Sequence, residues 1–461
     1  KIVTYDVNNI IAFDELKKLY GADIDIIPFY APEVQIREAI DKYYSFELSL
    51  TGILREIEQM KDKKIEDSRD DYVNPNVRLV DAILTDAVKR EASDIHFEPE
   101  GNFVRLRYRI DGKLQQMLTF HKRYWPSVMV RLKIVSEMNI AETRNPQDGR
   151  LSFNVLGRDV DFRVSSQPTV HGENVVFRIL DKAKALVELD KLGMDKEQVD
   201  LIKKLLHRPE GIFFVTGPTG SGKTTTLYSI LNYINTLDKN IMTLEDPVEY
   251  KIPIIRQSNI TQGTKLTFAE GVRALLRQDP DVIFVGETRD EATAAAAMRA
   301  AMTGHQVYST LHTNDSLASI QRMLDLGVSN NILAGSIICC IAQRLMRKLC
   351  VHCKQGYSAT AYEKKILGVK PSSKLKLYKP KGCEKCSFTG FKGRIGLYEM
   401  LTFNQELNSL IGQNADPVKL ELAASKIKSF KKLSESGIKR VLEGISSLEE
   451  LISVVDLTDR L

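Results

Sequence analysis

The sequence predicts an α/β fold in which buried parallel strands alternate with helices, preceded by a smaller α+β domain. The apolar runs Ile241–Leu244 and Val282–Val285 have the length of buried strands, and acidic residues follow both. A third run, Ile212–Val215, leads into a glycine-rich loop, and apolar residues at helical spacing follow that loop. Residues 103–110 instead alternate apolar and basic side chains, which is typical of a strand with one solvated face. These patterns indicate a parallel sheet in the middle of the chain and a half-exposed sheet before it.

The glycine-rich loop has the spacing G-x-x-x-x-G-K-T between a predicted strand and a predicted helix, and this context is typical of a P-loop. Glycine lets backbone N–H groups curl around a phosphate, and the helix N-terminus adds a partial positive charge. Lys223 is expected to bind the terminal phosphates and the Thr224 hydroxyl to bind Mg²⁺. We therefore predict ATP and Mg²⁺ as cofactors. The predicted nucleotide-binding residues are Gly217, Pro218, Thr219, Gly220, Ser221, Gly222, Lys223, Thr224 and Thr225.

Glu245, Glu287 and His312 each stand at the carboxyl end of a predicted strand. Ligands bind open α/β sheets at this edge, so these side chains are expected to meet at the P-loop, as they would in a RecA-like core. Glu245 is favoured for polarising the attacking water, and Glu287 for holding Mg²⁺ together with Thr224. Because both acids end neighbouring strands, the sequence leaves these two roles interchangeable.

An α+β domain is predicted over residues 72–182, with a helix at 77–90 and a hairpin turn at Asp111-Gly112. Its predicted sheet carries several arginines. One interpretation is a solvated face whose surface ion pairs have little energetic effect. The other is that Arg150 or Arg163 reaches a nucleotide held by a neighbouring P-loop domain, as arginine fingers do in phosphoryl transfer.

Four cysteines form two CxxC pairs, Cys350 with Cys353 and Cys383 with Cys386. Four thiolates in this spacing predict a closed, tetrahedral structural zinc site, and reduced free thiols are the alternative. The remaining two cysteines, at positions 339 and 340, lie in an apolar stretch that we expect to be a buried helix.

Composition sets the broad class of the protein. The chain has 461 residues, of which 43% are hydrophobic and 27% charged, and a net charge of +5. These values describe a soluble globular protein with several domains, and the charge is too small to predict nucleic-acid binding. The longest uncharged apolar stretch, 332–342, is shorter than the ~20 residues of a membrane helix, so a cytosolic protein is expected. Lys1 in place of a start methionine indicates a fragment or a processed chain.

Several motifs occur in an order that is more specific than any one of them. Ala-Ser-Asp-Ile-His-Phe-Glu-Pro precedes the P-loop, and Leu-Glu-Asp-Pro-Val-Glu-Tyr, Gly-Glu-x-Arg-Asp and Gly-His-x-Val-x-Ser-Thr-Leu-His-Thr-Asn follow it. The CxxC pairs and Thr-Gly-Phe-Lys-Gly-Arg-Ile-Gly come last. From about Asn74 to its C-terminus, the chain resembles the secretion ATPase superfamily, which includes the type II secretion ATPase and the type IV pilus assembly ATPase. Thr288 departs from this resemblance, since the family mostly has an apolar residue there.

The resemblance implies a homohexameric ATPase at the cytoplasmic face of the inner membrane, which powers pilin or pseudopilin assembly through an inner-membrane platform protein. By position it implies that Glu245, Glu287 and His312 serve ATP hydrolysis, that Arg150 and Arg163 approach a neighbouring site, and that the four CxxC cysteines bind zinc. Three alternatives are a pilus retraction ATPase of the same superfamily, a nucleic-acid-stimulated P-loop motor and a non-catalytic nucleotide sensor. The choice between a type IV pilus and a type II secretion system is left open.

Six segments are expected along the chain. They are the end of a truncated N-terminal partner-binding domain (1–59), a charged linker (60–71), an α+β sheet domain with the arginine fingers (72–182), a RecA-like ATPase core (190–349), a zinc-binding module (350–398) and a helical C-terminal subdomain (399–461).

Overall fold

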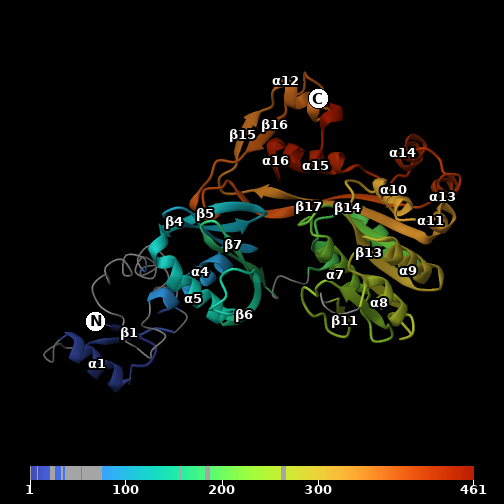
Figure 1. Ribbon diagram of the computed structural model, residues 1–461. Helices are drawn as coiled ribbons and strands as arrows, with labels where there is room; N and C mark the ends of the chain where they lie inside the picture. Colours follow the sequence, from blue (N-terminus) through green and yellow to red (C-terminus); the bar gives the residue numbers. More distant parts are fainter. Residues whose placement is uncertain are drawn as a thin grey trace. The chain divides into compact units, whose positions relative to one another are not determined.

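A computed structural model describes residues 2–7, 9–20, 26–32, 35–36, 53, 75–155, 157–181, 187–260 and 266–460 (Figure 1). The chain forms two compact units, Lys1–Ile179 and Leu180–Leu461. At the N-terminus, β1 (Ile2–Thr4) pairs in parallel with β2 (Pro28–Tyr30), and α1 (Ile10–Tyr20) stands between them in the chain. The predicted linker 60–71 lies outside the described residues, as do residues 37–52.

The first unit contains a six-stranded sheet in the order β5-β4-β3-β8-β7-β6, with antiparallel hairpins. Its strands and helices are α4 (Pro75–Lys89), β3 (Asp94–Pro99), β4 (Phe103–Ile110), β5 (Lys113–His121), α5 (Trp125–Val135), β6 (Gln147–Val155), β7 (Arg158–Thr169) and β8 (Gly172–Leu180). The alternation predicted for residues 103–110 is confirmed, because Val104, Leu106 and Tyr108 are fully buried. Asp111 and Gly112 follow with φ angles of 50° and 85°, as a two-residue hairpin turn requires.

The second unit is built on a seven-stranded sheet in the order β11-β10-β12-β13-β9-β14-β17. Its strands are β9 (Gly211–Thr216), β10 (Ile241–Glu245), β11 (Arg256–Asn259), β12 (Val282–Val285), β13 (Gln306–Leu311), β14 (Ile337–Leu349) and β17 (Phe391–Thr402). All neighbouring pairs are parallel except β14 with β17. The carboxyl ends of β9, β10, β12 and β13 therefore share one edge of the sheet, as the sequence predicts.

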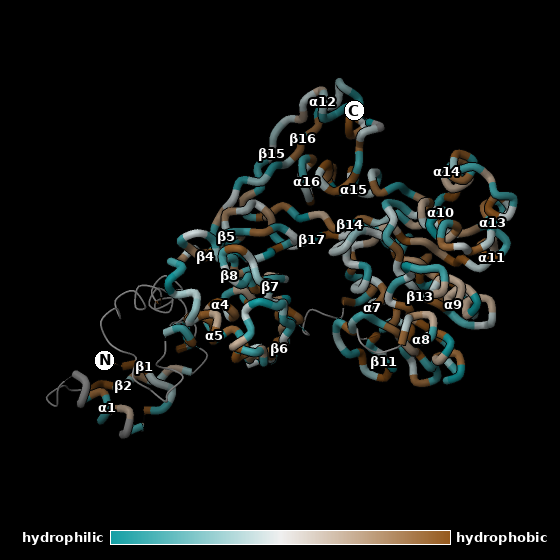
Figure 2. Tube along the Cα trace, in the orientation of Figure 1, coloured by the Kyte–Doolittle hydropathy of each residue, from teal (hydrophilic) through white to brown (hydrophobic). Residues whose placement is uncertain are grey.

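Helices cover both faces of this sheet, because alternate residues of β9 point to opposite sides. Ile212 and Phe214 belong to the core that includes α8 (Phe268–Leu275) and α9 (Glu291–Met302). Phe213 and Val215 pack instead with α6 (Lys196–Leu205) and α7 (Lys223–Ile234). Figure 2 shows hydrophobic segments in β13 and in the helices α8 and α9. Two further helices, α10 (Ala318–Asp325) and α11 (Asn330–Ser336), contribute to the first of these cores.

The expectation that Cys339 and Cys340 lie in a helix is wrong. Both are in β14, where they are buried core residues as predicted. The run 337–342 is apolar at every position because β14 is covered on both faces. A short continuous apolar run has no period that separates a buried strand from a buried helix.

The C-terminal part begins with a small two-stranded antiparallel sheet and ends in helices. Its elements are β15 (Gln355–Ser358), α12 (Ala361–Ile366), β16 (Lys376–Lys379), β17, α13 (Gln405–Gly412), α14 (Pro417–Ser425), α15 (Leu433–Leu442) and α16 (Leu448–Val454). The helical segment expected from residue 399 starts later, because β17 continues to Thr402 as the last strand of the large sheet. No helix among the described residues has the length and apolar content to cross a bilayer.

Candidate active site and metal centre

The P-loop occupies residues 217–222 between β9 and α7. Gly217, Gly220 and Gly222 have φ angles of 147°, 79° and 87°, which favour glycine. A Cβ atom at Gly217 would lie 2.5 Å from the backbone oxygen of Gln343, and one at Gly222 would lie 2.8 Å from the Gln343 side-chain nitrogen. Glycine is therefore required where the loop presses against β14.

Polar groups in and next to the loop are placed where they can bind an anion. Ser221 is buried, and its hydroxyl is one of the few buried polar side-chain atoms that lack a hydrogen-bond partner among the described residues. Lys223 is the first residue of α7, and its Nζ lies 2.7 Å from the Gly217 oxygen and 3.2 Å from the Pro218 oxygen. Burial lowers the pKa of Lys223 to about 8, although the nearby Glu287 carboxylate acts in the opposite direction. An unpartnered hydroxyl, a helix N-terminus and a partly desolvated ammonium group together fit a nucleotide phosphate.

Glu287 lies beside this loop, just beyond the carboxyl end of β12. Its Oε2 is 2.7 Å from Nη2 of Arg289 and 3.9 Å from Nε2 of His312. Burial and the charges of Lys223, Arg289 and Arg322 lower the pKa of His312, so its imidazole is neutral at pH 7. The structure thus brings Glu287 and His312 to the P-loop lysine.

Glu245 has a different environment. It is 3% exposed, and its carboxylate accepts hydrogen bonds from the Tyr228 hydroxyl, from Thr243 Oγ1 at 2.5 Å and from Gln257 Nε2 at 3.1 Å. Burial raises the pKa of Glu245, and these three donors oppose the rise. Tyr228 lies one turn of α7 beyond Thr224, so Glu245 is held at the side of the P-loop helix and not at its N-terminus.

Two residues that the sequence analysis did not single out complete the surroundings of the loop. Arg344 of β14 places Nη2 2.9 Å from the backbone oxygen of Asn314, and its charge contributes to the lowered pKa of Lys223. Gln343 accepts a 2.7 Å hydrogen bond from Thr226, 117 positions earlier in the chain. Only the pairing of β14 with β9 brings these side chains to the P-loop, so no local sequence pattern reveals them.

Two residues of the predicted motifs, Thr288 and His305, form hydrogen bonds with neighbouring elements. Thr288, where the family mostly has an apolar residue, is buried with its hydroxyl 2.8 Å from that of Ser309. His305 stands at the opposite end of β13 from His312, with Nδ1 3.0 Å from the Ala300 oxygen. The hydrogen bond of Thr288 explains how a polar residue fits at that position.

Arg150 of β6 and Arg163 of β7 lie directly opposite each other in the sheet of the first unit. Arg150 is exposed, and its N–H donates to the Ser136 oxygen over 3.1 Å. A Cβ atom on Gly149 would lie 2.2 Å from the same oxygen, so β6 is pressed against the end of α5. Like charges in directly opposed positions destabilise a sheet. Both arginines belong to the first unit, and the P-loop belongs to the second.

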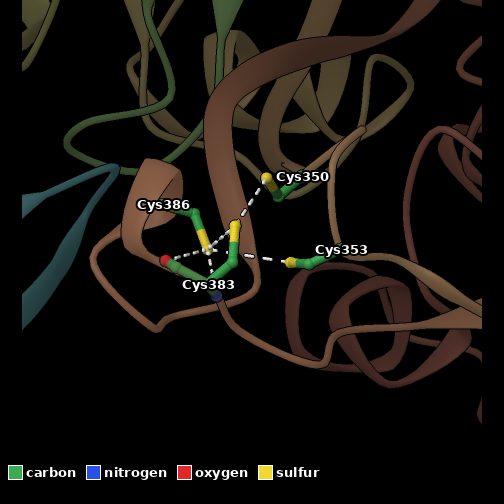
Figure 3. A group of neighbouring side chains, drawn as sticks. All are labelled: Cys350, Cys353, Cys383 and Cys386. Atoms are coloured by element: carbon green, nitrogen blue, oxygen red, sulfur yellow. Dashed lines mark hydrogen bonds between the residues drawn. The ribbon is translucent and has the colours of Figure 1, made fainter.

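The four CxxC cysteines form one cluster, shown in Figure 3. The sulfur atoms are 3.9 Å apart for Cys350 and Cys383, 3.8 Å for Cys353 and Cys386, and 3.8 Å for Cys383 and Cys386. A tetrahedral zinc site with Zn–S bonds of about 2.3 Å requires sulfur separations of about 3.8 Å. The N–H groups of Cys383 and Gly390 donate to the Cys386 sulfur, both over 3.2 Å. These residues fit a structural zinc ion.

Removing zinc is expected to unfold the segment around residues 350–390 while the P-loop core stays folded. The metal-binding free energy of a small closed site is folding free energy, on the order of 10 kcal/mol in isolated zinc modules. A chelator, or the change Cys383→Ser, should therefore open this segment to limited proteolysis and remove zinc from the protein. The change His352→Ala is the matched control, because His352 lies between two cysteines but outside the sulfur cluster. If the Cys383→Ser variant kept the zinc content and the protease resistance of the unchanged protein, the metal centre would be contradicted.

The fold and the loop together define a class of protein. A mostly parallel sheet carries a P-loop between its interior strand β9 and the following helix α7, and the acid Glu287 stands just beyond the end of β12, two strands away. This arrangement is that of a P-loop nucleoside triphosphatase.

The chain belongs to the Type II/IV secretion system protein family, whose model matches residues 69–453. It is 42% identical over 409 residues to Type II secretion system protein E of Aeromonas hydrophila, covering 88% of this chain and 80% of that protein. It is 40% identical over 461 residues to the Type IV pilus assembly ATPase PilB of Myxococcus xanthus, covering 97% and 81%. The solved structure of the pilus retraction motor PilT with bound ADP is similar, with 29% identity, a TM-score of 0.55 and coverage of 81% and 96%. The family resemblance seen in the sequence is confirmed.

Proposed function

We propose that this chain hydrolyses ATP at its P-loop and uses the free energy to drive the assembly of pilin or pseudopilin subunits. The observation that carries this proposal is the meeting of Lys223, Glu287 and the unpartnered Ser221 hydroxyl at one helix N-terminus. Two relatives of this chain are named as a type II secretion system protein and as a type IV pilus assembly ATPase.

We further propose that the working form is a homohexamer at the cytoplasmic face of the inner membrane, where it acts on a platform protein. Membership of the secretion family supports this arrangement. The opposed Arg150 and Arg163 are candidates for arginine fingers, which in phosphoryl transfer can be supplied by a neighbouring chain. In an oligomer, the first unit of one subunit could supply these arginines to the nucleotide of the next.

In the proposed mechanism, Lys223 and the loop N–H groups bind the β- and γ-phosphates of ATP. Thr224 and Glu287 would hold Mg²⁺, which neutralises charge on the phosphate oxygens when it is bound. Glu287, fixed by its ion pair with Arg289, orients the attacking water and accepts its proton. His312 is neutral and partly exposed next to Glu287, so it is suited to hydrogen-bond the phosphate.

The geometry favours Glu287 over Glu245 as the residue that orients the attacking water. Substituting each acid in turn should therefore lower kcat by different amounts. The change Glu287→Gln is expected to lower kcat by roughly 10²-fold or more, because an amide cannot accept the proton. The change Glu245→Gln is expected to lower kcat far less and to reduce the unfolding temperature. An amide nitrogen there would face the donors of Tyr228 and Gln257, at a cost of about 1–3 kcal/mol.

Both variants are to be measured for kcat at saturating ATP and for thermal unfolding, with the exposed Glu197→Gln on α6 as the neutral control. If Glu245→Gln lost as much kcat as Glu287→Gln while keeping its unfolding temperature, the water-polarising role would pass to Glu245.

The cellular role is tested by deleting the gene in its host and scoring surface pili and secreted enzymes separately. We expect one of the two to disappear, and a gene copy that carries Lys223→Ala should not restore it. A strain that keeps both pili and secretion would overturn the assembly function. In vitro, stimulation of ATP hydrolysis by DNA would instead indicate a nucleic-acid motor.

A further inference from the structure

The zinc-binding segment carries a charge that the rest of the chain does not. Residues 350–394 contain ten lysines and one arginine against two glutamates, a formal charge of +9. The whole chain carries +5, so the other residues sum to −4. Four thiolates and one Zn²⁺ would add a charge of −2 to the segment and leave it at +7. A basic segment in an otherwise weakly acidic chain indicates that this segment has an anionic partner.

This positive charge is directed to solvent. Nine of the eleven basic side chains in 350–394 are exposed. Of the two acids in the segment, Glu363 accepts hydrogen bonds from the Tyr357 hydroxyl at 2.5 Å and from the Thr360 N–H at 2.7 Å. Its carboxylate is therefore used to cap α12. Beside this helix, an open hollow of about 560 Å³ is lined by Lys364 and by further lysines.

The two metal-binding turns each carry an exposed apolar side chain. Val351, between Cys350 and Cys353, is 75% exposed, and Phe388, which follows Cys386, is 73% exposed. The sulfur atoms of the two turns lie 3.8–3.9 Å apart, so the turns that carry the two apolar side chains are adjacent. Exposed Val and Phe side chains on two turns that share one sulfur cluster offer apolar area for an interaction.

We propose that the zinc module binds the surface of an anionic bilayer directly, with its lysines at the lipid headgroups and with Val351 and Phe388 in the interfacial layer. Charge alone would suit an acidic protein equally well. The exposed apolar side chains favour lipid, because peripheral membrane binding combines electrostatic attraction with buried apolar area. This contact would add to the partner-mediated membrane position in the proposed function, and it does not depend on ATP hydrolysis.

The test is co-sedimentation of the full chain with vesicles, in the absence of nucleotide. We expect binding to vesicles of phosphatidylcholine mixed with phosphatidylglycerol, no binding to phosphatidylcholine alone, and weaker binding as salt is raised. Because ATP plays no part in this measurement, its failure would leave the ATPase function untouched.

Three exposed lysines flank the Phe388 turn in the sequence, namely Lys381, Lys385 and Lys392. Changing all three to glutamine is expected to weaken binding to the anionic vesicles at least tenfold, since each lysine near an anionic surface contributes about fivefold. The double change Val351→Ser with Phe388→Ser should also weaken binding while leaving the salt dependence in place. The exposed Lys196→Gln and Lys204→Gln on α6 form the matched control, which should bind like the unchanged protein.

Zinc content and thermal unfolding are to be measured for every variant, so that loss of the module's fold is recognised. Equal binding to neutral and anionic vesicles would overturn the proposal, and so would full vesicle binding by the triple lysine variant. Binding to polyglutamate but not to anionic vesicles would also overturn it and would indicate an acidic protein partner.

Discussion

Changing Lys223 to alanine is expected to reduce ATP turnover of the assembled protein by roughly 10³-fold or more. The Lys223 ammonium stands at the start of α7, with Nζ 2.7 Å from the Gly217 oxygen and the Glu287 carboxylate nearby. Its charge would be lost where negative charge develops on the transferring phosphate, which forfeits several kcal/mol of transition-state stabilisation. The measurement is kcat at saturating ATP, together with the dissociation constant for ATP.

A matched control for this change is Lys196→Ala, which removes an exposed lysine from α6. It should leave turnover unchanged, and both variants should unfold at nearly the same temperature as the unchanged protein. Lys223→Ala protein that still hydrolyses ATP at its normal rate would falsify the assignment of the P-loop as the catalytic site.

Changing Arg150 and Arg163 to alanine is expected to lower kcat by about 10³-fold, the lower end of what arginine fingers contribute. The two side chains are directly opposed in the β6–β7 pair, and Arg150 is exposed. The change Arg105→Ala on the same sheet is the control. Arg105 forms a 2.7 Å ion pair with Glu100 at the surface, and such pairs have small effects.

Mixing variants tests whether the arginines act between subunits. Subunits with both Arg150→Ala and Arg163→Ala, combined with subunits carrying Lys223→Ala, should recover part of the ATPase activity. In such mixtures, some sites combine an intact P-loop with the intact arginines of a neighbour. Specific activity of the unchanged protein should also rise with its concentration. Mixed oligomers that remain inactive, once pull-down of a tagged subunit shows that they form, would count against action between subunits.

Local sequence patterns are sufficient to predict many of the helices, strands and turns of this fold. Helix α9 (Glu291–Met302) has a local cause, because its alanines favour a helix and Asp290 caps it. The hairpin at Asp111-Gly112 follows from the positive φ angles that this pair accepts. In contrast, the helix expected around Cys339 and Cys340 is the strand β14, because a buried apolar run has no period that distinguishes the two.

Only part of the candidate site can be predicted from the sequence. Glu287 and His312 were expected at the P-loop because parallel strands end at one edge of the sheet, and the structure places them there. The hydrogen bonds that give Glu245 a different environment from Glu287 could not be predicted from the sequence. Their donors Tyr228 and Gln257 lie on α7 and β11. Their approach depends on how those elements pack and not on any spacing in the sequence.

The sequence by itself determined the elements whose cause is local. These are the glycine loop that begins α7, the apolar strands that precede the acids, and the two CxxC turns. Only the tertiary structure decided which acid faces Lys223, how Gln343 and Arg344 reach the P-loop, and how the four sulfur atoms gather at metal-binding distances. The physical reason is that backbone preference acts over a few neighbouring residues. The hydrogen bonds and charges of the site instead join segments that meet only when the sheet is assembled.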